Sequence, residues 1–248
     1  MTWKQSTIGE IIDSERDMFL KAGERYGEYF ANASEFNSLL NGFIKSIKAD
    51  RFLFAMFLSQ VRKHSTLAFF SAVRLHHIQA TMDLRQVLEA GACAAYAIAN
   101  IDPKDFADVD EQGLLNASQS LTKKRYDWLD KHYPQGSAAI RRMKETINSS
   151  SAHANIIYSH NNFTLALEHG RFETPFFDIE DEFLVKTDLW QIANIVMGLM
   201  DLCYGVNAKL DVIKFTDDFG PRLKELEAQN NKLKTEMLNS DRLKRFKK

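Results

Sequence analysis

The fold class follows from residues 51–79, RFLFAMFLSQVRKHSTLAFFSAVRLHHIQ. The first half of this stretch is apolar on every face of a helix, as expected for a helix that passes through the middle of a core. Asp50 stands directly before it, where a helix favours a capping side chain. We therefore expect one long helix over residues 51–79, surrounded by other helices.

The segments on both sides have the spacing of apolar residues that is typical of amphipathic helices. Only four prolines and eleven glycines occur in 248 residues, so long stretches lack a helix breaker. The sequence predicts an all-α multi-helix bundle. The other expected helices are residues 8–30 after a cap at Ser6 or Thr7, a helix from Ser34, residues 82–100, 116–132 and 136–160 on either side of a turn at 133–136, and a helix from Asp181 to about Ile213.

One region departs from the helical pattern. Residues 163–179 contain FTLAL and RFETPFFDI, which are rich in β-forming residues and are separated by an EHGR turn. They predict a small β-hairpin inserted in the bundle. Gly220-Pro221 marks a further break, so we expect a bundle domain over residues 1–215 and a separate C-terminal helix over 220–248.

The composition excludes several classes of protein. The 32 basic and 33 acidic residues leave a formal net charge of −1, so no overall field favours nucleic acid or an anionic membrane. The longest uncharged apolar run, Ala90 to Asn100, is far shorter than the ~20 residues that cross a bilayer. Cys93 and Cys203 lie in apolar stretches, as buried thiols do in a reducing compartment. We expect a cytoplasmic protein without a membrane span.

The strong enzymatic motifs are missing from the sequence: it has no nucleotide-binding glycine loop, no nucleophile elbow, no zincin motif and no paired C-x-x-C. No cofactor and no metal are therefore expected. His153 and His160 share a helix face, but about 10 Å of helix axis separates them, which is too far for one metal ion. A metal site would need a further ligand such as His76 or His77.

Arg125 and His132, in RYDWLDKH, have the Arg–His spacing of HEPN-type ribonucleases. Chance alone supplies such a spacing in a chain of this composition. The residue after Arg125 is a tyrosine, where that family usually has a polar residue. The pair remains the catalytic candidate, and it makes a metal-independent ribonuclease in a bacterial defence or toxin system the alternative function.

Arg85 and Glu89 lie four residues apart in MDLRQVLEAGACAAYAIAN, residues 82–100, just before an uncharged apolar run. They face the same way on a helix that enters the core, so we expect them to be largely buried and paired. The simpler interpretation is that they satisfy each other. In the functional one they join polar groups of another helix to form a binding pocket with His153 and His160, beside Ser149, Ser150 and Ser151.

These residues also carry a resemblance. LRQVLEAGACAAYAI followed by SSSAHANIIYSH resembles an uncharacterised group of bacterial helical proteins that have an Arg-x-x-x-Glu-Ala helix and a later Ser-x-x-x-His. The resemblance covers residues 50–210. It implies that Arg85, Glu89 and His153 belong to one site, and it implies no activity.

The C-terminal segment PRLKELEAQNNKLKTEML, residues 221–238, has a heptad pattern. Its seam predicts a parallel homodimer, because Asn230 occupies an a position. An asparagine there pairs with the same asparagine of the second chain in a two-stranded coil. The alternative is that the same side chains fold back on the bundle of their own chain. The seam consists of Leu223, Leu226, Asn230, Leu233 and Met237.

The chain ends in RLKRFKK, residues 242–248, which is either a solvated helix end or a tail that binds the phosphates of nucleic acid. The leading prediction of function is a non-enzymatic binding or assembly module. It rests on the missing catalytic motifs and on the heptad seam. The ligand of such a module is not indicated by the sequence.

Overall fold

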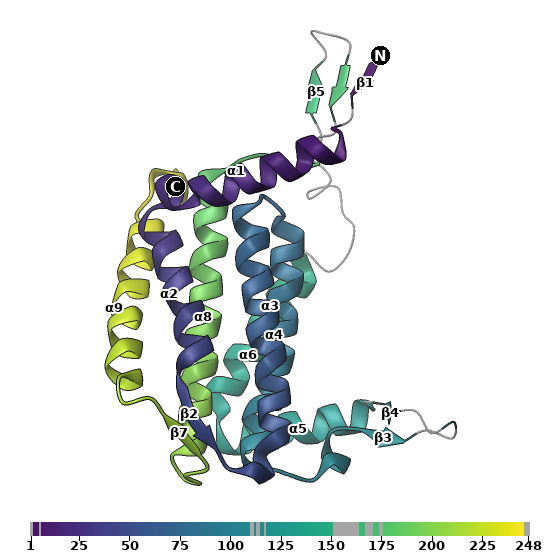
Figure 1. Ribbon diagram of the computed structural model, residues 1–248, viewed down its shortest axis with the longest axis vertical. Helices are drawn as coiled ribbons and strands as arrows, with labels where there is room; N and C mark the ends of the chain where they lie inside the picture. The colour runs from purple at the N-terminus through teal and green to yellow at the C-terminus, as the bar shows by residue number, and fades with distance from the viewer. Residues whose placement is uncertain are drawn as a thin grey trace.

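The computed structural model describes residues 2–4, 6–109, 112, 115–116, 118–150, 164–166, 171–173 and 176–245. Helices dominate this part of the chain, and most of them run side by side along the long axis of the molecule (Figure 1). The predicted all-α bundle with a small hairpin is confirmed.

The first two helices are α1 (Ile8–Tyr26) and α2 (Glu28–Gly42). Thr7 caps α1 in a capping box with Glu10, as one of the two predicted caps. The break between the helices comes at Gly27, whose φ of +53° is readily adopted only by glycine. The expected helix over residues 8–30 and the expected second start at Ser34 are therefore wrong.

The helix expected over residues 51–79 ends early, as α3 (Phe52–Val73), and the helix expected over residues 82–100 begins earlier, as α4 (His77–Ala99). The break is at Leu75, which has a φ of +58°. The amide of His76 bonds the carbonyl of Ser71, and the carbonyl of Leu75 accepts from the amide of Asp178. The chain reverses at this turn, and α3 and α4 make the most extensive helix contact of the described chain.

The helix α8 (Glu182–Asn207) lies at the centre of the bundle and contacts α2, α3 and α4. Asp181 caps it as predicted, because its carboxylate accepts from the amides of Phe183 and Leu184. Gly91 lets α4 approach closely, since a Cβ there would lie 2.5 Å from the Leu199 side chain. By length and composition α8 is the one described helix that could cross a bilayer, but 56% of its apolar window is buried in the bundle.

The helix α8 ends at Asn207 rather than near Ile213. The Asn207 side chain donates to the carbonyl of Ile213 at 2.9 Å and accepts from the amides of Val212 and Ile213. These bonds lead the chain into β7 (Ile213–Phe215), which pairs antiparallel with β2 (Ile44–Ile47).

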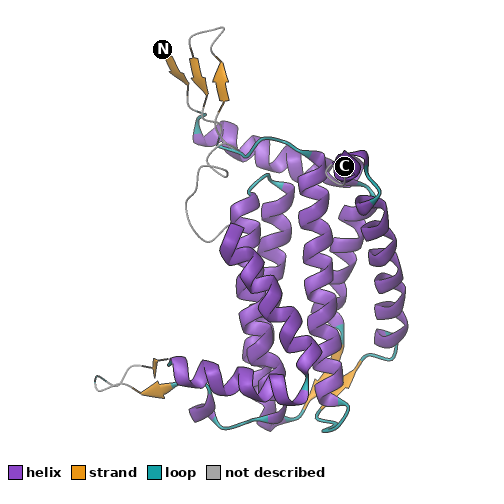
Figure 2. Ribbon diagram, turned by 180° about the vertical axis from the view of Figure 1, so that it is seen from behind, coloured by secondary structure: helices purple, strands orange, loops and turns teal. Residues whose placement is uncertain are grey.

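A second helical hairpin, α5 (Gln119–His132) and α6 (Pro134–Ser150), lies on the outer face of α4 (Figure 2). A single residue, Tyr133, separates the two helices, because Pro134 already begins α6. The expected turn over residues 133–136 is thus shorter than predicted. Short elements precede α3 and α5: 3-10 turns η1 (Ala49–Arg51) and η2 (Pro103–Asp105), and strands β3 (Asp108–Val109) and β4 (Leu115–Asn116).

The predicted hairpin is present as β5 (Thr164–Ala166) and β6 (Arg171–Glu173), which pair antiparallel with Leu165 opposite Phe172. The strand β1 (Thr2–Lys4) adds to β6 in parallel. Figure 1 shows this sheet beyond the N-terminal end of α1.

The C-terminal helix α9 (Phe219–Leu238) packs along α2 and α8 of its own chain, and the short α10 (Asp241–Arg245) follows it. Asn230 and Leu233 are 1% and 0% exposed. Leu223 and Leu226 pack against the core, and Met237 Sδ accepts a hydrogen bond from the Thr187 hydroxyl. The side chains of the heptad seam therefore pack on the bundle of their own chain, which is the alternative given above. The homodimer itself stays a prediction.

Candidate functional site

The clearest polar site of the described chain lies where α4, α5 and α6 meet. Arg85, Glu89 and Cys93 are spaced by four residues along α4, so they share one face of the helix. Both α5 and α6 contact α4. The site therefore combines side chains from three helices.

Glu89 is the centre of this site. Its Oε1 accepts from Arg85 Nε at 3.3 Å and from Lys144 Nζ of α6 at 3.1 Å. Lys144 Nζ also donates to the hydroxyl of Tyr126 on α5 at 3.3 Å. One carboxylate thus holds two cationic side chains, and a phenol from the third helix completes the arrangement.

Arg85 and Glu89 are paired as expected, but the pair is only partly buried. The two side chains are 31% and 38% exposed. An ion pair that is exposed to this extent contributes about 0–1 kcal/mol. Loss of Glu89 should therefore cost far less than the ~3–5 kcal/mol of a broken buried pair.

Arg125 of α5 brings a further positive charge to this site. Its Nη2 donates to the Thr122 hydroxyl at 3.4 Å, and its Nε is buried without a hydrogen-bond partner in the described chain. Burial raises the pKa of the Cys93 thiol, and the charges of Arg125, Glu89 and Lys144 all act on that thiol as well. All three charges are therefore close enough to Cys93 to act on it. We call Arg85, Glu89, Arg125 and Lys144 the cationic cluster.

The structure gives His132 different surroundings from Arg125. His132 is exposed, and its ring lies 5.0 Å from that of Trp128. The two residues are seven positions apart on α5, which corresponds to about 10 Å along the helix axis. Among the described residues no hydrogen bond, ion pair or ring contact joins them, and the charge of Arg125 acts on Cys93 together with the charges of Glu89 and Lys144.

The remaining predicted positions are only partly described. His153 and His160 lie outside the described residues, as do Phe246, Lys247 and Lys248 of the basic tail. Arg242 forms an ion pair with Asp181 and lies 4.9 Å above the Phe183 ring. Within the described ranges no three His, Cys, Asp or Glu side chains are grouped as metal ligands.

Lys144 and Tyr126 are the functional candidates that the sequence did not indicate. Both belong to polar-faced helices with many charged residues, and nothing in their local sequence separates them from exposed neighbours. Their relation to Glu89 depends on how α5 and α6 pack on α4. Only the tertiary structure reveals it.

Comparison of the chain with models of known protein families, with curated proteins and with solved structures finds no match. The function is therefore argued from the geometry of the cationic cluster.

Proposed function

We propose that this chain is a non-enzymatic binding module that holds a phosphate group of its ligand at the cationic cluster. The observation that carries the proposal is the charge balance of the site. Arg85 and Lys144 both contact the carboxylate of Glu89, and the charge of Arg125 acts with those of Glu89 and Lys144 on the neighbouring Cys93, so three cations share one carboxylate.

Partly buried cations without a counter-charge raise the free energy of the folded state. An anion bound between Arg125 and Lys144 would supply that counter-charge. The guanidinium of Arg125 suits a phosphate, because its planar array of N–H donors matches two phosphate oxygens, and its Nε is still without a partner in the described chain. The hydroxyl of Tyr126, which accepts from Lys144, adds a donor beside that cation.

The same geometry favours binding over catalysis. A nucleophilic cysteine needs a lowered pKa, whereas burial raises the pKa of Cys93. Among the described residues Arg125 donates to Thr122, the His132 ring lies beside that of Trp128, and no contact joins Arg125 to His132.

The test measures thermal unfolding in phosphate and in chloride of matched ionic strength. Binding of phosphate at about ten times its Kd should stabilise the wild-type chain by about 1.4 kcal/mol. Arg125→Gln and Lys144→Gln should each abolish this gain. Arg142→Gln is the matched control, because Arg142 lies on the same helix as Lys144 but is exposed and outside the cluster.

An equal response to phosphate in all four proteins, or no response in the wild type, would contradict the proposal. A second assay addresses catalysis. The purified protein is incubated with total RNA, with and without EDTA, beside an Arg125→Ala/His132→Ala variant. Cleavage that is lost only in the variant would show that the chain is an enzyme.

A further inference from the structure

A groove of about 200 Å³ lies between α6 and α8. Residues of α8 line one wall at spacings of three and four, and residues of α6 line the other, as expected for the facing sides of two helices. Leu88 of α4 also lines the groove and is 1% exposed, so the groove reaches the bundle core. Its other large apolar side chains are Ile140, Met143, Ile195, Leu199 and Leu202.

Gly198 widens this groove. It lies in the interior of α8, where glycine is less favourable than alanine or leucine. A Cβ at this position would meet no neighbouring side chain or helix of the described chain within 4 Å, so packing inside the chain does not require the glycine. The missing side chain leaves room for an apolar group of a bound molecule.

A carboxylate stands at the edge of the groove. Asp201 follows Gly198 by three residues and therefore shares its face of α8. It is exposed, it lines the groove, and among the described residues no cation or hydrogen-bond donor is paired with it. A carboxylate beside an apolar surface is complementary to the ammonium group of a ligand, which carries three N–H donors.

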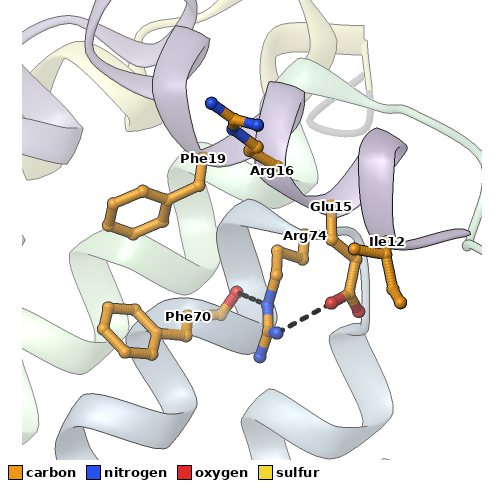
Figure 3. A pocket seen from close by; sticks show the side chains of 6 residues that line it. All are labelled: Ile12, Glu15, Arg16, Phe19, Phe70 and Arg74. Atoms are coloured by element: carbon orange, nitrogen blue, oxygen red, sulfur yellow. Dashed lines mark hydrogen bonds and ion pairs between the residues drawn. The ribbon is translucent and has the colours of Figure 1, made fainter. Parts of the chain in front are cut away.

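A second hollow, of about 330 Å³, lies between α1 and α3 (Figure 3). Its two arginines already have carboxylates of the chain beside them. Arg74 donates to Glu15 at 3.1 Å, and the charge of Arg16 acts on Asp17. Asp201 has no such partner in the described chain, so the groove between α6 and α8 is the one whose charge selects a ligand.

We propose that the groove between α6 and α8 binds a small primary amine whose apolar part is about the size of one aromatic ring. The ring occupies the space beside Gly198 and Met143, and the ammonium group meets the carboxylate of Asp201 at the solvent. An apolar cavity of about 150 Å³ holds benzene. A groove of about 200 Å³ therefore admits one ring with a short chain that carries the amine.

This amine site is separate from the cationic cluster and has the opposite charge. Leu88 and Met143 of the groove each precede a member of that cluster, Glu89 and Lys144, by one residue. Successive residues of a helix point about 100° apart. The two sites therefore use different faces of α4 and α6.

The first test is calorimetric titration of the full chain with phenethylamine, and with phenethyl alcohol as a neutral probe of the same shape. The wild type should bind the amine about five times more tightly than the alcohol, which is the upper range for an exposed ion pair. Asp201→Asn should bind the two probes equally. Asp127→Asn is the matched control, because Asp127 is an exposed carboxylate of α5 outside the groove, and it should retain the preference. Equal affinity for both probes in the wild type overturns the assignment to amines.

The second test fills the groove. Gly198→Leu should bind neither probe and should unfold at or above the temperature of the unliganded wild type, because leucine is the better helix former. Gly42→Leu is its control, since Gly42 is also an exposed helical glycine whose Cβ would meet nothing within 4 Å in the described chain. It should bind as the wild type does. Undiminished binding by Gly198→Leu, or no binding by the wild type, overturns the proposal.

The third test locates the ligand by nuclear magnetic resonance of isotope-labelled methionine methyl groups. Phenethylamine should shift the signal of Met143, which is identified by its loss in Met143→Leu. The signal of Met56, which is 57% exposed on α3, should stay unchanged. Binding that leaves the Met143 signal unchanged would place the ligand elsewhere and contradict the proposal.

Discussion

His77 is the residue whose ionisation is most closely tied to the fold. Its Nδ1 lies 2.5 Å from Asp188 Oδ2, and both side chains are largely buried between α4 and α8. Its backbone amide donates to Asp178 Oδ2 at 2.8 Å. This one residue therefore links the start of α4 to α8 and to the segment that precedes α8.

Opposing influences set the protonation of His77. Burial alone would lower the pKa of the ring, but the hydrogen bond and charge of Asp188, with the charges of Asp178 and Asp181, outweigh it. The pKa of His77 is raised as a result. Burial also raises the pKa of Asp188. The charged imidazole is thus favoured by the fold more than by the unfolded chain.

We expect this pair to make the stability of the protein depend on pH. A histidine with a raised pKa in the folded state stabilises it fully below the unfolded pKa of about 6.5, and that contribution is lost as the pH rises through the folded pKa. The wild type should therefore be more stable than His77→Gln at mildly acidic pH. This difference in the free energy of unfolding should shrink as the pH rises to mildly alkaline values. Urea unfolding of both proteins across this range measures the difference, and a constant difference contradicts the expectation.

At the scale of elements, the asparagine of the α9 stripe has a partner within the chain. Asn32 Nδ2 of α2 donates to Asn230 Oδ1 at 3.0 Å, and both residues are buried. The other amide atoms of the pair, Asn32 Oδ1 and Asn230 Nδ2, have no partner in the described chain. A polar residue on a heptad stripe thus fixes the register of two helices, as in a coiled coil, but the helices belong to one chain.

This pair predicts a non-additive response to substitution. Asn230→Leu or Asn32→Leu alone should lower the free energy of unfolding by about 1–3 kcal/mol, because each leaves a buried amide without its partner. The double variant should lose less than either single one, since both polar groups are then replaced by apolar ones. Urea unfolding of the four proteins tests this. Strictly additive losses would mean that the two side chains act independently.

The elements also show which features a sequence can reveal. The caps at Thr7 and Asp181 and the hairpin near residue 170 were predicted, because each depends on residues close together in the chain. The break at Leu75 was not, because leucine gives no local signal for a positive φ and the turn is held in part by Asp178. The candidate site likewise has one part that a sequence can predict and one part that it cannot. The Arg85–Glu89 pair follows from helical spacing, whereas Lys144 joins it only through packing.

At the scale of the whole molecule, α9 is part of the bundle core. Leu233 and Phe219 are buried, and the Tyr29 hydroxyl donates to the carbonyl of Leu233 at 2.9 Å. Trp190 of α8 donates to the carbonyl of Asn230 at 3.1 Å. Phe219 also belongs to an aromatic group beside the β2–β7 pair, with Phe43, Tyr204 and Phe215.

Deletion of residues 216–248 tests the predicted division of the chain into 1–215 and 220–248. The truncated chain would expose Tyr29 of α2, Phe43 directly after α2 and Trp190 of α8. It would also lose the buried Phe219 and Leu233. Each lost large apolar contact costs about 2–5 kcal/mol, and a domain has only about 5–15 kcal/mol in total. We therefore expect no cooperative thermal transition from residues 1–215.

A shorter deletion is the control, because it removes the end of the chain and keeps α9. Removal of residues 240–248 takes away α10 and the ion pair of Arg242 with Asp181, in which Arg242 is 46% exposed. Such a pair contributes at most about 1 kcal/mol, so this variant should unfold cooperatively within a few degrees of the full chain. If residues 1–215 also unfolded cooperatively near that temperature, the bundle would be an independent domain. The contacts of α9 would then add to its stability without being required for its core.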